Sequence, residues 1–271
     1  MAVSLPIDTS DRKPIGRETV SAIGLGTWAI RDYRVAEEVF VQAVELGIDN
    51  IDTAEMYGAG RAEEFVGRVA RRVGRSRVFI TTKMLPEHLY SRDEVEKAAR
   101  ASLRRLGVES VDLFLIHWPN TSLSIEEQVR NFEVVYEKGY ARYIGVSNFG
   151  RRELEEALSA TRRAEIVVDQ VHYSVLHKWA ERELLAYAIR EGVSIQAYTP
   201  LERGAVANHP IVRAVAREVG KTPIQVALNY LISRPRVIAI PKTESMEHLR
   251  EIVGSMGWRL PADMIRRLES I

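Results

Sequence analysis

Residues 78–117 read VFITTKMLPEHLYSRDEVEKAARASLRRLGVESVDLFLIH, and this stretch decides the fold. An apolar run, Val78–Lys83, comes first, and a second apolar run, Asp112–His117, closes the stretch. Between them, Ser91 and Glu94 form the capping-box pattern that typically opens a helix. The stretch therefore predicts a strand, a helix and a second strand.

The same alternation continues along the chain in both directions. Eight short apolar runs are separated by longer segments of helical period, most of which end at a glycine, as helices often do. The runs are Ser21–Thr27, Asn50–Ala54, Val78–Lys83, Asp112–His117, Tyr143–Asn148, Ile166–Val171, Ser194–Thr199 and Val237–Pro241. They read as continuous apolar runs rather than as a strict alternation of apolar and polar residues, which is typical of parallel strands buried on both faces.

Eight strand–helix units predict an α/β fold of the (β/α)8 TIM barrel type. The main alternative, an open doubly wound sheet, usually has a glycine-rich phosphate turn after its first strand. Here Gly24-Leu25-Gly26 is followed by Thr27-Trp28, without a third spaced glycine. The segment Val3–Val20 suits a β-hairpin that closes the bottom of the barrel. We expect one domain over residues 1–271, because such barrels typically span ~250 residues.

Composition narrows the classes of partner. The chain has 38 basic and 37 acidic side chains, so it lacks the basic excess of a nucleic-acid-binding protein. It has no cysteine, which rules out disulfides and thiolate metal sites, and we expect no bound metal. No apolar run reaches the roughly 18 residues of a membrane span, and no leader is evident. We therefore expect a cytoplasmic monomer that acts on a small molecule.

Polar side chains close several of the predicted strands. Asp52 and Tyr57 follow the second strand, Lys83 ends the third, and His117 ends the fourth. Reacting groups of TIM barrels lie at the carboxyl ends of the strands, so these four side chains should meet at one mouth. Each alone could be a turn cap, a surface charge or a packing residue. Together they form a candidate active site.

Motifs around these residues resemble those of the aldo-keto reductase family, short prokaryotic type, and they occur in the family's order over nearly the whole chain. The motifs are Gly24–Trp28, Asp52-Thr53-Ala54 with Tyr57-Gly58, Lys83, His117-Trp118-Pro119, Gly145–Phe149, Asp169-Gln170-Val171, Tyr198–Leu201 and Ile240-Pro241-Lys242. The resemblance implies a catalytic tetrad of Asp52, Tyr57, Lys83 and His117. It also implies reduction of aldehydes and ketones to alcohols by NAD(P)H, with Tyr57 as the general acid.

These residue types suit that chemistry. Hydride addition to a carbonyl leaves an alkoxide, which needs a proton or a positive field. Tyrosine has a pKa of ~10. An ammonium group about 4 Å away could lower this pKa by at most about three pH units. Lys83 would supply that charge and Asp52 would hold Lys83 in place. A neutral His117 would donate a hydrogen bond to the substrate oxygen.

The resemblance implies NADPH as the cofactor, with NADH as a weaker alternative. The implied cofactor-binding residues are Thr27, Trp28, Asp52, Ser147, Asn148, Gln170, Tyr198, Leu201, Arg203, Lys242, Thr243 and His248. Within this set, Ser147, Asn148 and Gln170 would hold the nicotinamide carboxamide, and Tyr198 would stack on its ring. The implied substrate-binding residues are Trp28, His117 and Trp118, and Met84 is a further candidate for the same wall.

Two departures from the family pattern bear on specificity. Many members carry an arginine six residues after the lysine that corresponds to Lys242, but this chain has His248 there. Histidine is mostly neutral at pH 7, so we expect a smaller preference for NADPH. The chain ends at Ile271 and the loop Asn120–Ser124 is short, so we expect an open mouth and broad specificity.

Two rival functions remain. In a lyase or aldolase, Lys83 would form a Schiff base with the substrate, which leaves Tyr57, Gln170 and Tyr198 unexplained. In a regulatory subunit, the barrel would sense the cofactor without turning over substrate, and the complete tetrad argues against this.

Overall fold

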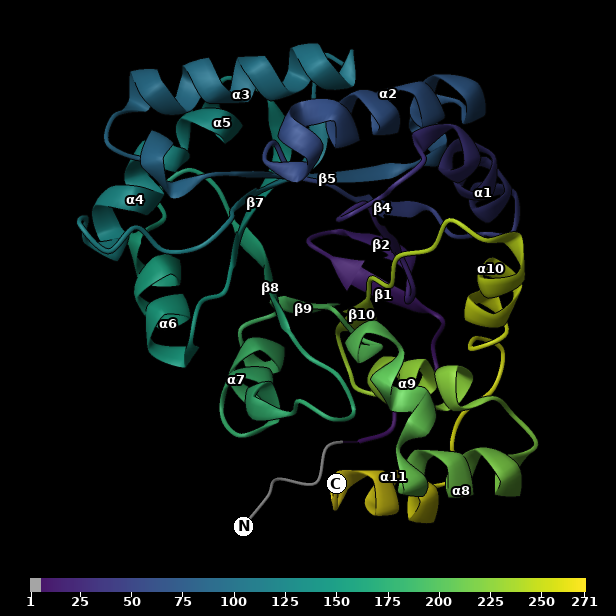
Figure 1. Ribbon diagram of the computed structural model, residues 1–271. Coiled ribbons are helices and arrows are strands. Elements are labelled where there is room, and N and C mark those ends of the chain that lie inside the picture. Colours follow the sequence, from purple (N-terminus) through teal and green to yellow (C-terminus); the bar gives the residue numbers. More distant parts are fainter. Residues whose placement is uncertain (1–5) are drawn as a thin grey trace.

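A closed ring of eight parallel strands forms the centre of the protein (Figure 1). The computed structural model describes residues 6–271. The strands are β3 (Leu25–Gly26), β4 (Asn50–Asp52), β5 (Phe79–Met84), β6 (Val111–Ile116), β7 (Ala141–Ser147), β8 (Ile166–His172), β9 (Ser194–Tyr198) and β10 (Val237–Ala239). Each pairs with its neighbours in the chain, so spatial order follows sequence order.

The first and last strands complete the ring. A parallel bridge joins Ile23 to Ala239, and the amide of Gly24 donates to the Ala239 carbonyl at 2.8 Å. The amide of Gly26 donates to the Pro241 carbonyl at 2.9 Å. The predicted barrel is therefore confirmed, and the open doubly wound alternative is wrong.

Helices surround the strands on the outside, and α11 follows the barrel (Figure 1). They are α1 (Tyr33–Glu45), α2 (Arg61–Val73), α3 (Arg92–Leu106), α4 (Ile125–Phe132), α5 (Val134–Glu137), α6 (Arg151–Ala160), α7 (Leu184–Arg190), α8 (Pro210–Val219), α9 (Pro223–Ile232), α10 (Met246–Val253) and α11 (Ala262–Glu269). In residues 6–271, none of the helices combines the length and apolar character needed to cross a bilayer.

The predicted helix starts are present. The Ser91 hydroxyl accepts a hydrogen bond from the Glu94 amide at 3.2 Å and begins α3. Ser124 and Glu127 form a complete capping box at the start of α4. These local signals lie within one turn of the helix they begin, which is why the sequence reveals them.

The arginines on the outer face of α2 pair with α1. Arg68 contacts Glu37 at 3.0 Å, and Arg72 contacts both Glu37 and Glu38. The opposite face of α2 is buried against the barrel. These charges therefore join two neighbouring helices and need no anionic partner to explain them.

A β-hairpin made of β1 (Arg12–Ile15) and β2 (Glu18–Ser21) covers the bottom of the barrel, as predicted. Ile15 and Val20 are fully buried and pack with side chains from inside the ring. The Ser194 hydroxyl at the start of β9 donates to the Pro14 carbonyl. The amino-terminal ends of the strands are thus closed, and the opposite ends are left for the chemistry. Val3–Leu5, where the predicted hairpin segment begins, lie outside the described residues.

The predicted first strand, Ser21–Thr27, is wrong in its extent. Ser21 ends the hairpin strand β2, and only Leu25–Gly26 forms a barrel strand. Ser21 pairs with Arg12 in the hairpin, and its amide donates to the Asp49 carboxylate at 2.7 Å, so it does not take part in the barrel sheet. Gly24 then passes close to Asn50, and a Cβ there would lie 2.5 Å from the Asn50 side chain.

Candidate active site

The four side chains of the tetrad come from three neighbouring strand ends. Asp52 ends β4, Lys83 lies in β5, and His117 directly follows β6. Tyr57 begins a short 3-10 segment, Tyr57–Gly60 (η1), after β4. Two consecutive left-handed residues follow it, with φ of 58° at Gly58 and 55° at Ala59, and this tight turn keeps Tyr57 beside the strand ends.

Lys83 is the centre of the arrangement. Its Nζ donates to Asp52 Oδ2 at 2.8 Å, to the Thr53 carbonyl at 2.9 Å and to Tyr57 Oη at 3.1 Å. The side chain of Lys83 is fully buried, and that of Asp52 nearly so. An ammonium group with three oxygen partners has its donors satisfied away from water. The positive charge of Lys83 therefore lies in direct contact with the hydroxyl of Tyr57.

Burial and charge act on this group in opposite directions. Burial alone would lower the pKa of Lys83, but Asp52 and Tyr57 raise it overall, so the amine stays protonated. Burial raises the pKa of Asp52, although Lys83 and Gln170 oppose this. Burial also raises the pKa of Tyr57 above its ordinary value, and this effect exceeds the lowering by Lys83. The expected net fall in the pKa of Tyr57 is therefore wrong.

His117 faces Tyr57 across the mouth. The two rings meet edge to face with centroids 5.7 Å apart, and the Trp118 ring lies 4.6 Å from His117. The His117 carbonyl accepts from Asn148 Nδ2 at 3.0 Å, which fixes its backbone. Burial, followed by the charge of Lys83, lowers the pKa of His117 to about 3. Its imidazole is neutral at physiological pH.

Amide and hydroxyl side chains continue the site from β7 to β9. Gln170 Nε2 donates to Asp52 Oδ1 at 2.7 Å and to Gln196 Oε1 at 2.9 Å. Tyr198 Oη donates to Asn148 Oδ1 at 2.8 Å, and the Ser147 hydroxyl donates to the Gln170 carbonyl at 2.8 Å. The predicted carboxamide-binding residues therefore form one network that reaches the tetrad through Asp52.

The loop after β9 crosses toward the loop after β3. Three of its non-glycine residues, Thr199, Glu202 and Arg203, have positive φ angles of 51°, 48° and 54°. The Arg203 guanidinium lies over the Trp28 ring, 5.4 Å from its centroid. Leu201 packs against the core, and the buried hydroxyl of Thr27 has no partner among residues 6–271. The structure thus brings together predicted residues from the first and seventh strand ends.

The loop after β10 carries the other predicted cofactor residues. Lys242 is exposed, whereas Thr243 is buried and its hydroxyl donates to the Ser245 carbonyl at 3.2 Å. His248 lies exposed in the first turn of α10. The side chain of Glu244, which sequence reasoning missed, contacts Lys242 Nζ directly. The signal for it was available, since an acid two residues after Lys242 places a negative charge beside a lysine that is predicted to bind the cofactor.

Comparison with known proteins agrees with this geometry. A profile of the Aldo/keto reductase family matches residues 22–271. The chain belongs to the aldo/keto reductase family. It is 32% identical over 245 residues to methylglyoxal reductase YeaE of Escherichia coli. This aligned region covers 87% of this chain and 85% of the Escherichia coli protein. It is 34% identical over 257 residues to an aldo-keto reductase of Mycolicibacterium smegmatis, covering 93% of this chain and 87% of that one.

Solved structures of aldo/keto reductases share the fold. A thermostable aldo-keto reductase bound to the inhibitor epalrestat superimposes with a TM-score of 0.89 at 37% identity, covering 96% of this chain and 98% of that one. An aldo/keto reductase from Klebsiella pneumoniae, solved with NADP and acetate, has a TM-score of 0.89 at 30% identity, covering 96% and 94%. The protein is therefore an oxidoreductase, and the predicted cofactor agrees with that complex.

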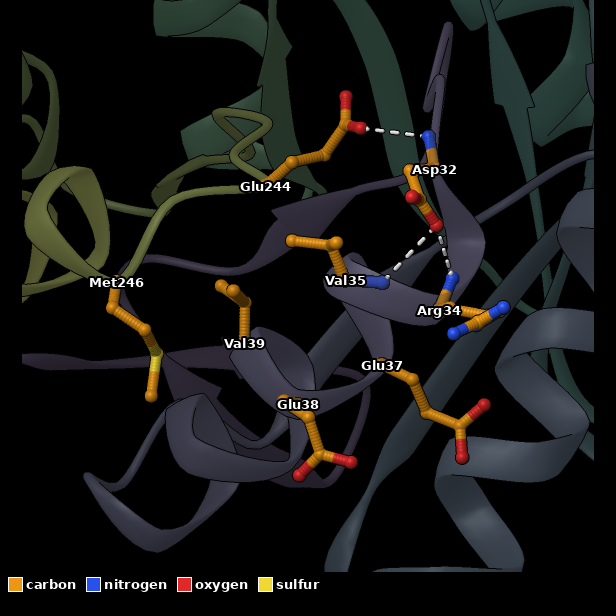
Figure 2. Close-up of a pocket in the computed structure, with 8 residues that line it drawn as sticks. All are labelled: Asp32, Arg34, Val35, Glu37, Glu38, Val39, Glu244 and Met246. Atoms are coloured by element: carbon orange, nitrogen blue, oxygen red, sulfur yellow. Dashed lines mark hydrogen bonds between the residues drawn. The ribbon is translucent and has the colours of Figure 1, made fainter.

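Two features lie outside this aldo/keto reductase site. Met84 is fully buried in the core, so it does not line the predicted substrate site. A shallow hollow of about 660 Å³ lies between α1 and α10 (Figure 2). Its lining includes no member of the tetrad, and the chemistry belongs to the strand ends rather than to this hollow.

Proposed function

We propose that this aldo/keto reductase reduces aldehydes and ketones to alcohols with NADPH, and that Tyr57 donates the proton. The observation that carries the proposal is the buried ammonium of Lys83, which bonds Asp52 and Tyr57 at once. A phenol beside a fixed positive charge can lose its proton to an alkoxide while the resulting phenolate is stabilised.

Tyr57 begins the reduction in the protonated form. Burial raises the pKa of Tyr57, so the phenol holds its proton at neutral pH. When the substrate oxygen gains negative charge, Tyr57 Oη gives up that proton and Lys83 stabilises the anion left behind. Asp52 keeps Lys83 charged and oriented through the 2.8 Å contact. Asp52 is thus a positioning residue, while Tyr57 reacts directly.

His117 orients the carbonyl. With its pKa lowered to about 3 by burial and by Lys83, the ring is neutral and can donate one hydrogen bond without competing for the proton of Tyr57. Its backbone is tied to Asn148, so the ring has a fixed position beside Tyr57. Two donors on one oxygen define where the carbonyl carbon lies.

The residues present fit a nicotinamide dinucleotide. Gln170 lies beside Asp52, Asn148 lies beside Tyr198, and the half-buried ring of Tyr198 completes this polar wall. Bound there, the reduced nicotinamide supplies the hydride that the protein itself lacks. Leu201 and Arg203 would border its pyrophosphate, and Lys242 and Thr243 would hold its 2′-phosphate, with His248 at the position where many relatives have an arginine. The choice of NADPH is supported by relatives solved with it, including an aldo-keto reductase from Klebsiella pneumoniae.

The substrate would enter between Trp28 and Trp118. Trp28 is half exposed and Trp118 partly buried, so apolar surface borders His117 and Tyr57. A short loop, Asn120–Ser124, leaves this border open, and we expect broad specificity. Methylglyoxal is a suitable first substrate, because a relative is named a methylglyoxal reductase.

The Schiff-base alternative is disfavoured by the same geometry. The Nζ of Lys83 already has three partners and the side chain is fully buried. A nucleophilic amine must be neutral and must reach the substrate carbon. The pKa of Lys83 is instead raised by Asp52 and Tyr57 against the effect of burial.

Replacing Tyr57 with phenylalanine tests the proposal. We expect Tyr57→Phe to lower kcat for methylglyoxal reduction by about 10²- to 10⁴-fold, because the proton donor is lost. Equilibrium binding of NADP⁺ should be retained. Tyr136→Phe, on the exposed surface of α5, is the matched control and should keep wild-type activity. Near wild-type turnover by Tyr57→Phe would refute the assignment.

A further inference from the structure

One carboxylate, that of Glu244, joins the loop after β10 to the segment before α1. Its Oε1 contacts Lys242 Nζ, and its Oε2 accepts from the amides of Arg31 at 3.1 Å and Asp32 at 2.9 Å. Figure 2 shows the bond to Asp32 beside the hollow between α1 and α10. Three donors therefore converge on one side chain.

Glu244 is ionised in this setting. Burial alone would raise the pKa of Glu244, but Lys242 and the two backbone amides lower it overall. The side chain is mostly buried, with 18% of it exposed, so its charge is only partly screened by water. The positive charge of Lys242 is therefore balanced before any ligand arrives.

The carboxylate is also held in place. Asp32 caps α1, and its side chain accepts from the amides of Arg34 and Val35 at 2.9 and 3.2 Å (Figure 2). The two amides that hold Glu244 Oε2 thus belong to a segment that is itself fixed. A phosphate that bound Lys242 would meet a negative charge that cannot easily swing away.

Resting on the NADPH function proposed above, we propose that Glu244 is a specificity-determining residue that competes with the cofactor's 2′-phosphate for Lys242. A dinucleotide with a free 2′-hydroxyl brings no charge to this point and is not opposed. Glu244 thereby reduces the preference for NADPH over NADH, and it does so independently of the histidine at position 248.

Binding measurements on Glu244→Gln test this without turnover. Glutamine can still accept hydrogen bonds from the Arg31 and Asp32 amides but lacks the charge. We expect adenosine 2′,5′-bisphosphate and NADP⁺ to bind about two- to fivefold more tightly by calorimetry, the range for a partly exposed ion pair. Binding of NAD⁺ should be unchanged. Glu247→Gln makes the same charge change on the exposed start of α10 and should leave all three ligands unaffected.

The outcomes separate this inference from the proposed function. Unchanged or weaker bisphosphate binding by Glu244→Gln overturns the role of Glu244, as does an equal gain in Glu247→Gln. Lys242→Met should weaken bisphosphate binding. If Lys242→Met binds the bisphosphate as tightly as the wild type does, and still binds NADP⁺, the 2′-phosphate lies elsewhere and the inference fails. If neither dinucleotide binds the wild-type protein, the proposed function itself fails.

Discussion

Burial of His117 beside a fixed positive charge has a cost that depends on pH. In the unfolded chain a histidine takes up a proton near pH 6.5, but in the folded protein burial and Lys83 hold the pKa of His117 at about 3. Between these values only the unfolded state binds the proton. The mismatch therefore costs nothing above pH 6.5, and it lowers the free energy of unfolding increasingly as the pH falls toward 3.

Acid sensitivity should follow from this one side chain. Between pH 7 and pH 5, the mismatch at His117 should lower the free energy of unfolding by about 2 kcal/mol. The variant His117→Asn should lose that much less stability over the same interval, measured by urea unfolding at both pH values. His248→Asn, on the exposed surface of α10, is the control and should behave like the wild type. An identical loss in wild type and His117→Asn would contradict this account.

The residue types of the tetrad could be predicted from the sequence, but their electrostatics could not. Strand ends place Asp52, Lys83 and His117 at one mouth once the barrel is recognised. The direction of the pKa shift of Tyr57 depends on how deeply its hydroxyl is buried, and a sequence motif does not show the burial of a side chain. The contact between Glu244 and the segment before α1 joins distant parts of the chain, and the local sequence gives no sign of it.

Helices α2 and α3 approach each other closely at Gly67. A Cβ on this residue would lie 2.0 Å from the Leu106 carbonyl oxygen. That atom belongs to the backbone, so it cannot move aside as the end of a flexible side chain could. The two helices lie side by side along one edge of the ring (Figure 1). Gly67 therefore sets how near they come.

Alanine at position 67 should force these helices apart. Although alanine favours helix by about 1 kcal/mol over glycine, we expect Gly67→Ala to destabilise the protein by a net of at least about 2 kcal/mol. Gly220→Ala is the comparison, because φ is +65° there and nothing lies within 4 Å, so only backbone strain of about 1 kcal/mol applies. Denaturant midpoints of both variants measure the difference. Equal effects would mean that the clash is relieved at no cost.

At the scale of elements, the sequence revealed what is decided locally. The caps at Ser91 and Ser124 depend on residues within one turn and were found. The break between α4 and α5 at Glu133 was not anticipated. The Glu133 carboxylate accepts from the amides of Arg162, Arg163 and Ala164, and these partners lie about thirty residues away in the chain.

The two ends of the barrel have different roles: one is closed by packed side chains, and the other carries the tetrad. The hairpin fills the amino-terminal end with Ile15 and Val20, while every residue of the tetrad lies at the carboxyl end. The order of strands could be predicted because each unit follows its neighbour. The single domain over residues 1–271 and the monomeric state stay predictions.

Removing a buried side chain from the bottom of the barrel should destabilise the fold without changing carbonyl reduction. We expect Ile15→Ala to lower the free energy of unfolding by about 2–4 kcal/mol, since a fully buried side chain leaves a cavity. The KM for carbonyl substrates should not change. Ile7→Ala, at an exposed position, is the control and should alter neither quantity. A raised KM in Ile15→Ala alone would show that the two ends are coupled.

The bridge between Ile23 and Ala239 also has a temporal consequence. The two partners lie far apart in the chain, so β3 leaves the ribosome long before β10 exists. Until then one edge of the growing sheet has unpaired backbone amides and carbonyls, the kind of edge that invites association with other chains. The last strand therefore both completes the structure and removes the surface through which an unfinished copy would aggregate.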